Sequence, residues 1–377
     1  MSKYIIVSLI ILGTVYLCTL WKNNKENYEN NKKEKYIFYQ DQLTLKDITN
    51  NKYKIQYEVR GIDNNEIQSI LLKNIKLVIN KVERIITKSN KINYMTEDKK
   101  FIKDLYLIIT LIDGYIKEED GTDSSDTVGG SNINIIKKQS DNIFPVIATI
   151  QLLKKSALVD IAAKYPNGYN RFYYILLHEI LHTLGIGFLW TYPDYDKKIP
   201  RDKYERYWID TVDTNPIYIG PSLDKYNGLS ATVYYYSQFI GIKPGKIKGI
   251  PIEDNGNGGS RLYHWEQGNY IASDIISKDS RFVNNIHTPG LDNEIMTAWG
   301  TNKQPLISTI SIANLEDLGY KVNYNEADIS KIKDLDSIPK QITHNEIEPM
   351  TVNTVQLVSI MIIFIILAFY LILLKIS

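Results

Sequence analysis

The pattern of apolar and polar positions in the first half of the chain predicts strands that alternate with helices. Residues Ile55–Arg60 alternate apolar and polar positions at the period of a strand. Apolar residues then recur at helical spacing from Ile67 to Ile86, which predicts a long amphipathic helix. Leu105–Ile112 is a continuous apolar run rich in β-branched residues, as in a central strand, and Phe144–Leu152 is a further candidate strand with a proline near its start. The first half therefore has the order of elements of an α/β unit.

The second half shows no sustained period until its last helix. Residues 188–260 are rich in Tyr, Pro and Gly and are expected to form an insertion of short elements. Its tyrosines are expected to pack within the protein, although lining a peptide groove is an alternative: Tyr204, Tyr207, Tyr218, Tyr226, Tyr234, Tyr235 and Tyr236. From Ile307 the pattern is helical again and ends at Asp317-Leu318-Gly319-Tyr320, where Gly319 supplies a left-handed stop.

Two apolar segments lie at the ends of the chain. Tyr4–Trp21 and Leu357–Leu374 each contain 18 residues without a charge, and a helix of that length just crosses about 30 Å of hydrocarbon. The first is expected to be an uncleaved anchor because no small-x-small site follows it, with a cleaved signal peptide as the alternative. The second is expected to span the membrane. Lysines after the first segment place the central region in the cytoplasm, whereas Lys375 indicates the opposite side, so membrane sidedness stays open.

Composition limits the chemistry that the chain can perform. The net charge of +1 provides no general attraction to nucleic acid. The one cysteine, Cys18, lies inside the first apolar segment, so any metal in the rest of the chain must be held by histidines and carboxylates. The acidic run from Glu118 to Asp126 matches no EF-hand spacing, and we interpret it as a solvated loop rather than a calcium site.

The candidate catalytic motif is His178-Glu179-Ile180-Leu181-His182. Residues four apart lie on one face of a helix, so His178 and His182 can hold one zinc ion. Zinc acidifies a water molecule, Glu179 takes its proton as general base, and the resulting hydroxide attacks a peptide carbonyl. The pattern also occurs by chance in buried amphipathic helices. The apolar context of the helix favours a metal, and Gly185 allows a turn that lets a distant third ligand approach.

Four motifs in order resemble the leishmanolysin family of zinc metallopeptidases, a branch of the metzincin clan. They are the helix running into Leu184-Gly185-Ile186-Gly187 and Leu189-Trp190, the His264-Trp265 pair, the Glu294-Ile295-Met296-Thr297 turn, and Ser308–Tyr320. The resemblance implies that Met296 forms a Met-turn beneath the zinc. Phe188 stands where most metzincins carry their third histidine, and the leishmanolysin branch instead supplies that ligand from beyond an insertion. The family's latency cysteine has no counterpart here.

The third ligand is expected to be His264, with His287 as the alternative. The Tyr263-His264-Trp265-Glu266 context matches the family, and a catalytic zinc takes three protein ligands. However, His264 precedes Met296 by 32 positions, much further than in the family, whereas His287 precedes it by nine. His344 is expected to be solvated in the tail.

The resulting prediction is an α+β, metzincin-like, two-lobed fold with a mixed twisted sheet and a smaller C-terminal subdomain. The function expected is that of a membrane-anchored zinc metalloendopeptidase acting on protein or peptide substrates, without a nucleic-acid partner. A catalytically inactive zinc-binding or adhesion protein on the same fold, and a membrane-bound structural protein with a chance motif, are the alternatives. The expected segments are 1–21 anchor, 22–50 polar stalk, 51–187 catalytic subdomain, 188–260 insertion, 261–325 C-terminal subdomain, 326–354 linker and 355–377 transmembrane helix.

Overall fold

The computed structural model describes residues 37–331 and 343–344, except for 62–64, 114–115, 118–122, 125–127, 191–207, 213–214, 255–259, 268–281, 284–285, 289, 292 and 299–302. Both predicted membrane segments, and most of the acidic run from Glu118 to Asp126, lie outside these residues. Among the helices that are described, none is both long and apolar enough to cross a membrane.

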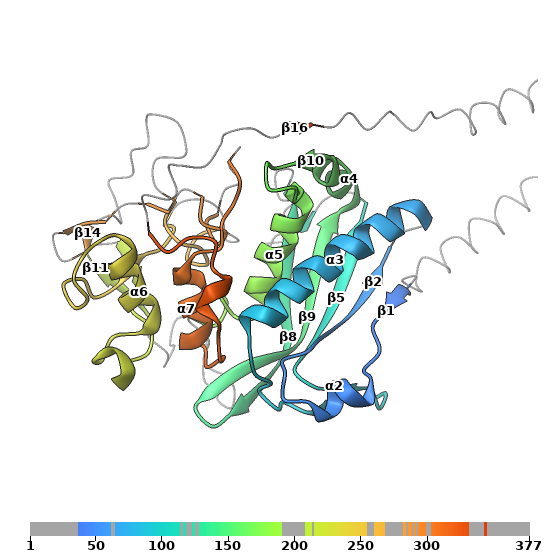
Figure 1. The fold of residues 1–377 in the computed structure, drawn as a ribbon, viewed down its shortest axis with the longest axis horizontal. Coiled ribbons are helices and arrows are strands. Elements are labelled where there is room, and N and C mark those ends of the chain that lie inside the picture. Colours follow the sequence, from blue (N-terminus) through green and yellow to red (C-terminus); the bar gives the residue numbers. More distant parts are fainter. Residues whose placement is uncertain are drawn as a thin grey trace, which may run out of the picture.

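A five-stranded mixed sheet forms the centre of the first half (Figure 1). Its strands, in spatial order, are β1 (Ile37–Gln40), β2 (Ile55–Arg60), β5 (Leu105–Ile112), β9 (Asn142–Leu153) and β8 (Gly129–Gln139). The three central strands run parallel, with Ile55 beside Leu105 and Tyr106 beside Ile147, and the two edge strands are antiparallel to their neighbours. The three strands predicted from the apolar pattern are β2, β5 and β9, and they are confirmed.

Two helices lie side by side over one face of this sheet (Figure 1). They are α3 (Asn65–Ile85) and α5 (Arg171–Thr183), and the shorter α4 (Lys154–Ala162) packs against α5. Along α3 the side chains of Leu71, Ile75, Val78 and Val82 are at most 1% exposed and recur at intervals of three and four residues. This spacing places them on one stripe, which explains why the sequence pattern predicted the helix correctly.

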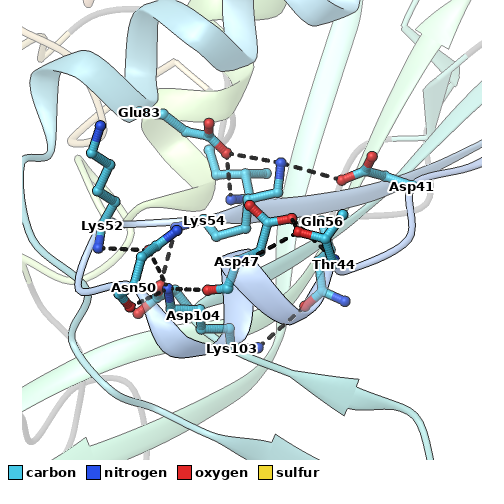
Figure 2. A network of polar contacts seen from close by, with 11 residues as sticks. Asp41, Thr44, Asp47, Asn50, Lys52, Lys54, Gln56, Glu83, Lys103 and Asp104 are labelled. Atoms are coloured by element: carbon cyan, nitrogen blue, oxygen red, sulfur yellow. Dashed lines mark hydrogen bonds and ion pairs between the residues drawn. The ribbon is translucent and has the colours of Figure 1, made fainter.

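Two secondary-structure elements lie within the segment 22–50, which was predicted to be a polar stalk. The strand β1 and the short helix α2 (Leu45–Thr49) lie inside that segment, so the stalk prediction is wrong from Ile37 onward. Thr44 and Asp47 form a capping box on α2, and the Lys103 Nζ donates to the Asn50 carbonyl oxygen at 2.9 Å (Figure 2). Asp104 accepts from the Lys54 backbone N–H at 3.0 Å. These elements are held by polar contacts and do not produce a periodic pattern of apolar residues. The sequence pattern therefore did not predict them.

Short elements make up the predicted insertion and the region after it. The strands are β11 (Ile209–Val212), β12 (Asn215–Tyr218) and β13 (Ile250–Pro251) in one sheet, and the pair β14 (Phe282–Val283) and β15 (Ile286–His287). The helices are η1 (Asp224–Tyr226), α6 (Ala231–Phe239), α7 (Thr309–Asp317) and η2 (Tyr324–Glu326). The remaining strand pairs are β3 (Tyr94–Met95) with β4 (Phe101–Ile102), β6 (Ile116–Lys117) with β7 (Asp123–Ser124), and β10 (Ala163–Lys164) with β16 (Thr343–His344). His344, predicted to lie in a solvated tail, thus has a paired backbone.

Three aromatic side chains connect this region to α7. Trp190 and Trp265 pack with their ring centroids 4.6 Å apart, and Tyr218 packs against both. Each ring also donates a hydrogen bond to a side chain of α7, with Asn314, Ser311 and Asp317 as acceptors at 2.9 to 3.0 Å. The helix then stops at Gly319, whose φ of +98° confirms the predicted left-handed end. The described residues therefore form an α+β fold with a mixed sheet, as predicted.

Candidate metal centre

The helix α5 carries two of the predicted site residues on one face. Asn170 caps its first turn by accepting from the Tyr173 N–H at 2.9 Å, and apolar residues bury most of its surface against the sheet. His178 and His182 follow one turn apart near its end. Gly185, two residues beyond the helix, has a φ of +115°, which confirms the predicted sharp turn.

His264 reaches α5 on a segment that lies between two others. Glu253 donates its N–H to the His264 carbonyl at 2.9 Å on one side, and Trp265 donates its N–H to the Met296 carbonyl at 3.0 Å on the other. Gly187 lets this segment approach the end of α5, because a Cβ there would lie 2.4 Å from the Tyr263 carbonyl oxygen. The segment is therefore fixed by backbone contacts on three sides.

The three histidines meet through their Nε2 atoms. The distance is 3.0 Å from His182 to His178, 3.0 Å from His182 to His264 and 3.2 Å from His264 to His178. Tetrahedral zinc with bonds of about 2.0–2.1 Å would hold its nitrogen ligands about 3.3 Å apart. The spacing is therefore close to that of a three-histidine zinc site, and this buried triad has the donors to bind a metal ion.

Hydrogen bonds fix the tautomer of each ring. Every Nδ1 faces a backbone carbonyl, namely Ile295 O for His178 at 2.6 Å, Ile186 O for His182 at 2.9 Å and Ser260 O for His264 at 2.9 Å. A carbonyl oxygen only accepts, so each Nδ1 carries the hydrogen and each Nε2 of a neutral ring presents a lone pair. Three lone pairs cannot hydrogen-bond to one another, whereas one cation satisfies all three.

Burial disfavours the protonated forms of the His182 and His264 rings. It lowers the pKa of His182 well below its usual value, and the neighbouring His178 and His264 lower that pKa further. Burial, again with a contribution from His178, lowers the pKa of His264 to about 3. Protonation of His182 or His264 therefore does not relieve the close approach of the Nε2 lone pairs at neutral pH.

Glu179 lies beside the triad without belonging to it. Its side chain is buried, and this burial raises its pKa, although His178 and Ser131 oppose the rise. The edge strand β8 packs directly on it, because a Cβ at Gly129 would lie 3.0 Å from the Glu179 Oε1. A buried carboxyl with a raised pKa is suited to accept and return a proton.

The Glu294–Thr297 segment lies against both ligand-bearing segments. The Ile295 carbonyl accepts from His178, and the Met296 carbonyl accepts from Trp265. Met296 itself is completely buried, so its predicted place in the interior is confirmed. The Met-turn role implied by the family resemblance stays a prediction.

The other histidine candidates are placed elsewhere. His264 completes the triad with His178 and His182. The backbone of His287 lies on β15, where it pairs with Phe282. Phe188, at the position of the usual metzincin ligand, packs its ring against His182 with the centroids 5.4 Å apart.

Sequence reasoning missed a second cluster of possible ligands. One carboxylate oxygen from each of Glu253, Asp254 and Glu266 lies within 4.8 Å of the others. Glu266 is on the same segment as His264, and the Glu253 N–H donates to the His264 carbonyl. Carboxylates alone are donors for calcium or magnesium, whereas imidazoles are preferred by zinc. The histidine triad is therefore the candidate zinc centre.

No protein-family model matches the chain, and a search of curated proteins finds no significantly similar sequence.

Proposed function

We propose that the protein is a zinc metalloendopeptidase in which His178, His182 and His264 hold the metal and Glu179 is the general base. The observation that carries the proposal is that the three Nε2 atoms lie within 3.2 Å of one another. The Nδ1 of each ring also faces a backbone carbonyl, which fixes the orientation of the ring. Hydrogen bonding of this kind to the second ring nitrogen is usual for histidines that bind metals.

The three imidazoles fit zinc in donor type, number and spacing. When bound, zinc acts as a Lewis acid that acidifies water and polarises a carbonyl oxygen. Three protein ligands are the number that catalytic zinc sites use, because a fourth position must stay open. The backbone carbonyls that accept the Nδ1 hydrogens hold the rings in this orientation before the metal binds.

Glu179 supplies the proton transfers. Its carboxylate accepts a proton from the attacking water, and the raised pKa favours the protonated form that results. The same carboxyl then passes that proton to the leaving amine. Glu179 extends from α5 and contacts β8 at Gly129, which restricts the directions in which the carboxyl can point.

The leishmanolysin-like metzincin assignment is part of the proposal. It is supported by the mixed sheet, the turn at Gly185, the arrival of His264 from beyond an insertion, and the buried Met296. We further propose that peptide substrates bind between the two lobes, and that the terminal apolar segments attach the enzyme to a membrane. An inactive zinc-binding or adhesion protein is the second candidate, and the intact Glu179 argues against it.

The Glu179→Gln variant tests the mechanism. Purified full-length wild type is expected to contain one zinc per chain and to cleave members of a peptide library. The variant is expected to retain its zinc and lose hydrolysis, because Glu179 is a base and not a ligand. Wild-type turnover in the variant would refute the assigned role. A zinc-loaded wild type that cleaves nothing in the library would favour the inactive alternative.

A further inference from the structure

Glu294 is a buried acid near the metal centre that the proposed chemistry does not use. Its side chain is 1% exposed, and burial raises the pKa of the carboxyl while several hydrogen bonds oppose the rise. An acid is rarely buried to this degree unless its oxygens are fully hydrogen-bonded.

Both carboxyl oxygens of Glu294 accept hydrogen bonds from the backbone. Oε2 accepts from the Met296 N–H at 2.6 Å, and Oε1 accepts from the Ser308 N–H at 3.1 Å and from the Ser308 hydroxyl at 2.8 Å. Ser308 is also the N-cap of α7. The carboxyl therefore ties the Glu294–Thr297 turn to the start of that helix.

A third contact leads towards His264. The Ser311 side chain interacts with the Glu294 carboxyl, and its hydroxyl accepts from the Trp265 indole N–H at 3.0 Å. Trp265 is the residue after His264, and its backbone N–H donates to the Met296 carbonyl. One end of the network is therefore adjacent to a proposed ligand.

The other end reaches His178. The carbonyl that accepts the His178 Nδ1 hydrogen belongs to Ile295, which lies between Glu294 and the Met296 N–H that Glu294 holds. Any rotation of this peptide segment turns the Ile295 carbonyl and with it the His178 ring. Losing such a partner of a metal-bound histidine typically lowers metal affinity by about 10- to 100-fold.

We propose that Glu294 is a positioning residue for the metal centre, which sets the orientation of His178 through the Ile295 carbonyl and that of His264 through Ser311 and Trp265. This inference rests on the proposed metal site. It adds that a single carboxyl orients two proposed metal ligands, His178 and His264, which are far apart in the sequence.

A glutamine cannot replace Glu294 in this network. Its amide offers one acceptor oxygen and one NH2 group, which only donates. In one orientation the NH2 faces the Met296 N–H, and in the other it faces the Ser308 N–H. Either orientation places two donors against each other, so one backbone contact must break.

The test measures the zinc affinity of the full-length chain by competition with a chelator. Glu294→Gln is expected to bind zinc about 10- to 100-fold more weakly than wild type. The cobalt-substituted protein should also show a changed visible absorption spectrum, because that spectrum reports ligand geometry. His178→Ala is the positive control for loss of a ligand.

Asp317→Asn is the matched structural control. Asp317 is also a buried carboxyl that accepts from the Ala231 N–H, the Thr232 N–H and the Tyr218 hydroxyl, and none of these hydrogen bonds reaches the triad. This variant is expected to be less stable, with unchanged zinc affinity and cobalt spectrum in the folded protein. Ser311→Ala, which removes the hydroxyl between Glu294 and Trp265, tests the connection to His264 if Glu294→Gln does not fold, and it is expected to weaken zinc binding.

The outcomes separate the two proposals. If His178→Ala keeps wild-type zinc affinity, the metal site itself is wrong. If His178→Ala loses zinc while Glu294→Gln retains the wild-type affinity and cobalt spectrum, the positioning role of Glu294 is refuted and the metal site stands. The same result for Ser311→Ala refutes the part of the role that acts on His264.

Discussion

The substitution Gly187→Ala tests whether close backbone packing holds His264 on the metal centre. Gly187 has a φ of +78°, and its missing Cβ would lie 2.4 Å from the Tyr263 carbonyl oxygen and 3.0 Å from the Tyr263 Cα. An alanine there must therefore displace backbone rather than a flexible side chain. Tyr263 immediately precedes His264.

The magnitude of the effect follows from two separate costs. A left-handed backbone costs an L-residue roughly 1–2 kcal/mol. The contact must also open by about 1 Å, because nonbonded atoms pack at roughly 3.5 Å. Metal–ligand distances tolerate only about 0.2 Å, so His264 would leave its position. We expect zinc affinity to fall by more than the roughly 10- to 100-fold typical of losing an outer hydrogen-bond partner.

Gly241→Ala is the matched control for this experiment. Gly241 has nearly the same φ, +75°, but an added Cβ would meet nothing within 4 Å. Both variants therefore carry the backbone strain, and only Gly187→Ala carries the collision. Zinc affinity from chelator competition, measured alongside unfolding midpoints, separates the two costs. Equal zinc affinities in Gly187→Ala, Gly241→Ala and wild type would refute the reasoning.

Two further predictions concern the buried acid of α7 and the ends of the chain. Burial raises the pKa of Asp317 to about 7, so the native state keeps a proton that the unfolded state loses above about 3.8. The free energy of unfolding should therefore fall as pH rises from about 4 to 7, by roughly 4 kcal/mol at most, and urea unfolding should show this part of the pH dependence disappear in Asp317→Asn. The full-length chain should also resist extraction by alkaline carbonate, because two uncharged segments of 18 residues flank the central region, and its release into the supernatant would contradict the membrane anchors.

The elements that could be predicted are those in which burial creates a period in the sequence. The helix α3 and the strands β2, β5 and β9 bury long apolar runs, so their patterns suffice. The edge strand β8 is mostly half-buried or exposed and is held by backbone pairing to β9, so its sequence carries little pattern. The short helix α2 depends on caps and distant polar contacts, and no apolar stripe marks it.

The candidate site was predictable to the extent that it depends on local geometry. A helix fixes the spacing of His178 and His182, whereas the distance of His264 from Met296 in the sequence left His287 as an alternative. Only the fold brings the Ser260–Gln267 segment to the end of α5. The role inferred for Glu294 was not predictable, because its partners are backbone groups and a serine hydroxyl 14 positions away.

Zinc stoichiometry in two histidine variants tests the central claim most directly. The purified full-length chain is expected to hold one zinc ion, and His264→Ala should lose it under conditions in which wild type retains it. His287→Ala should keep one zinc per chain. Retention of zinc by His264→Ala, together with its loss from His287→Ala, would contradict the three-histidine centre described here.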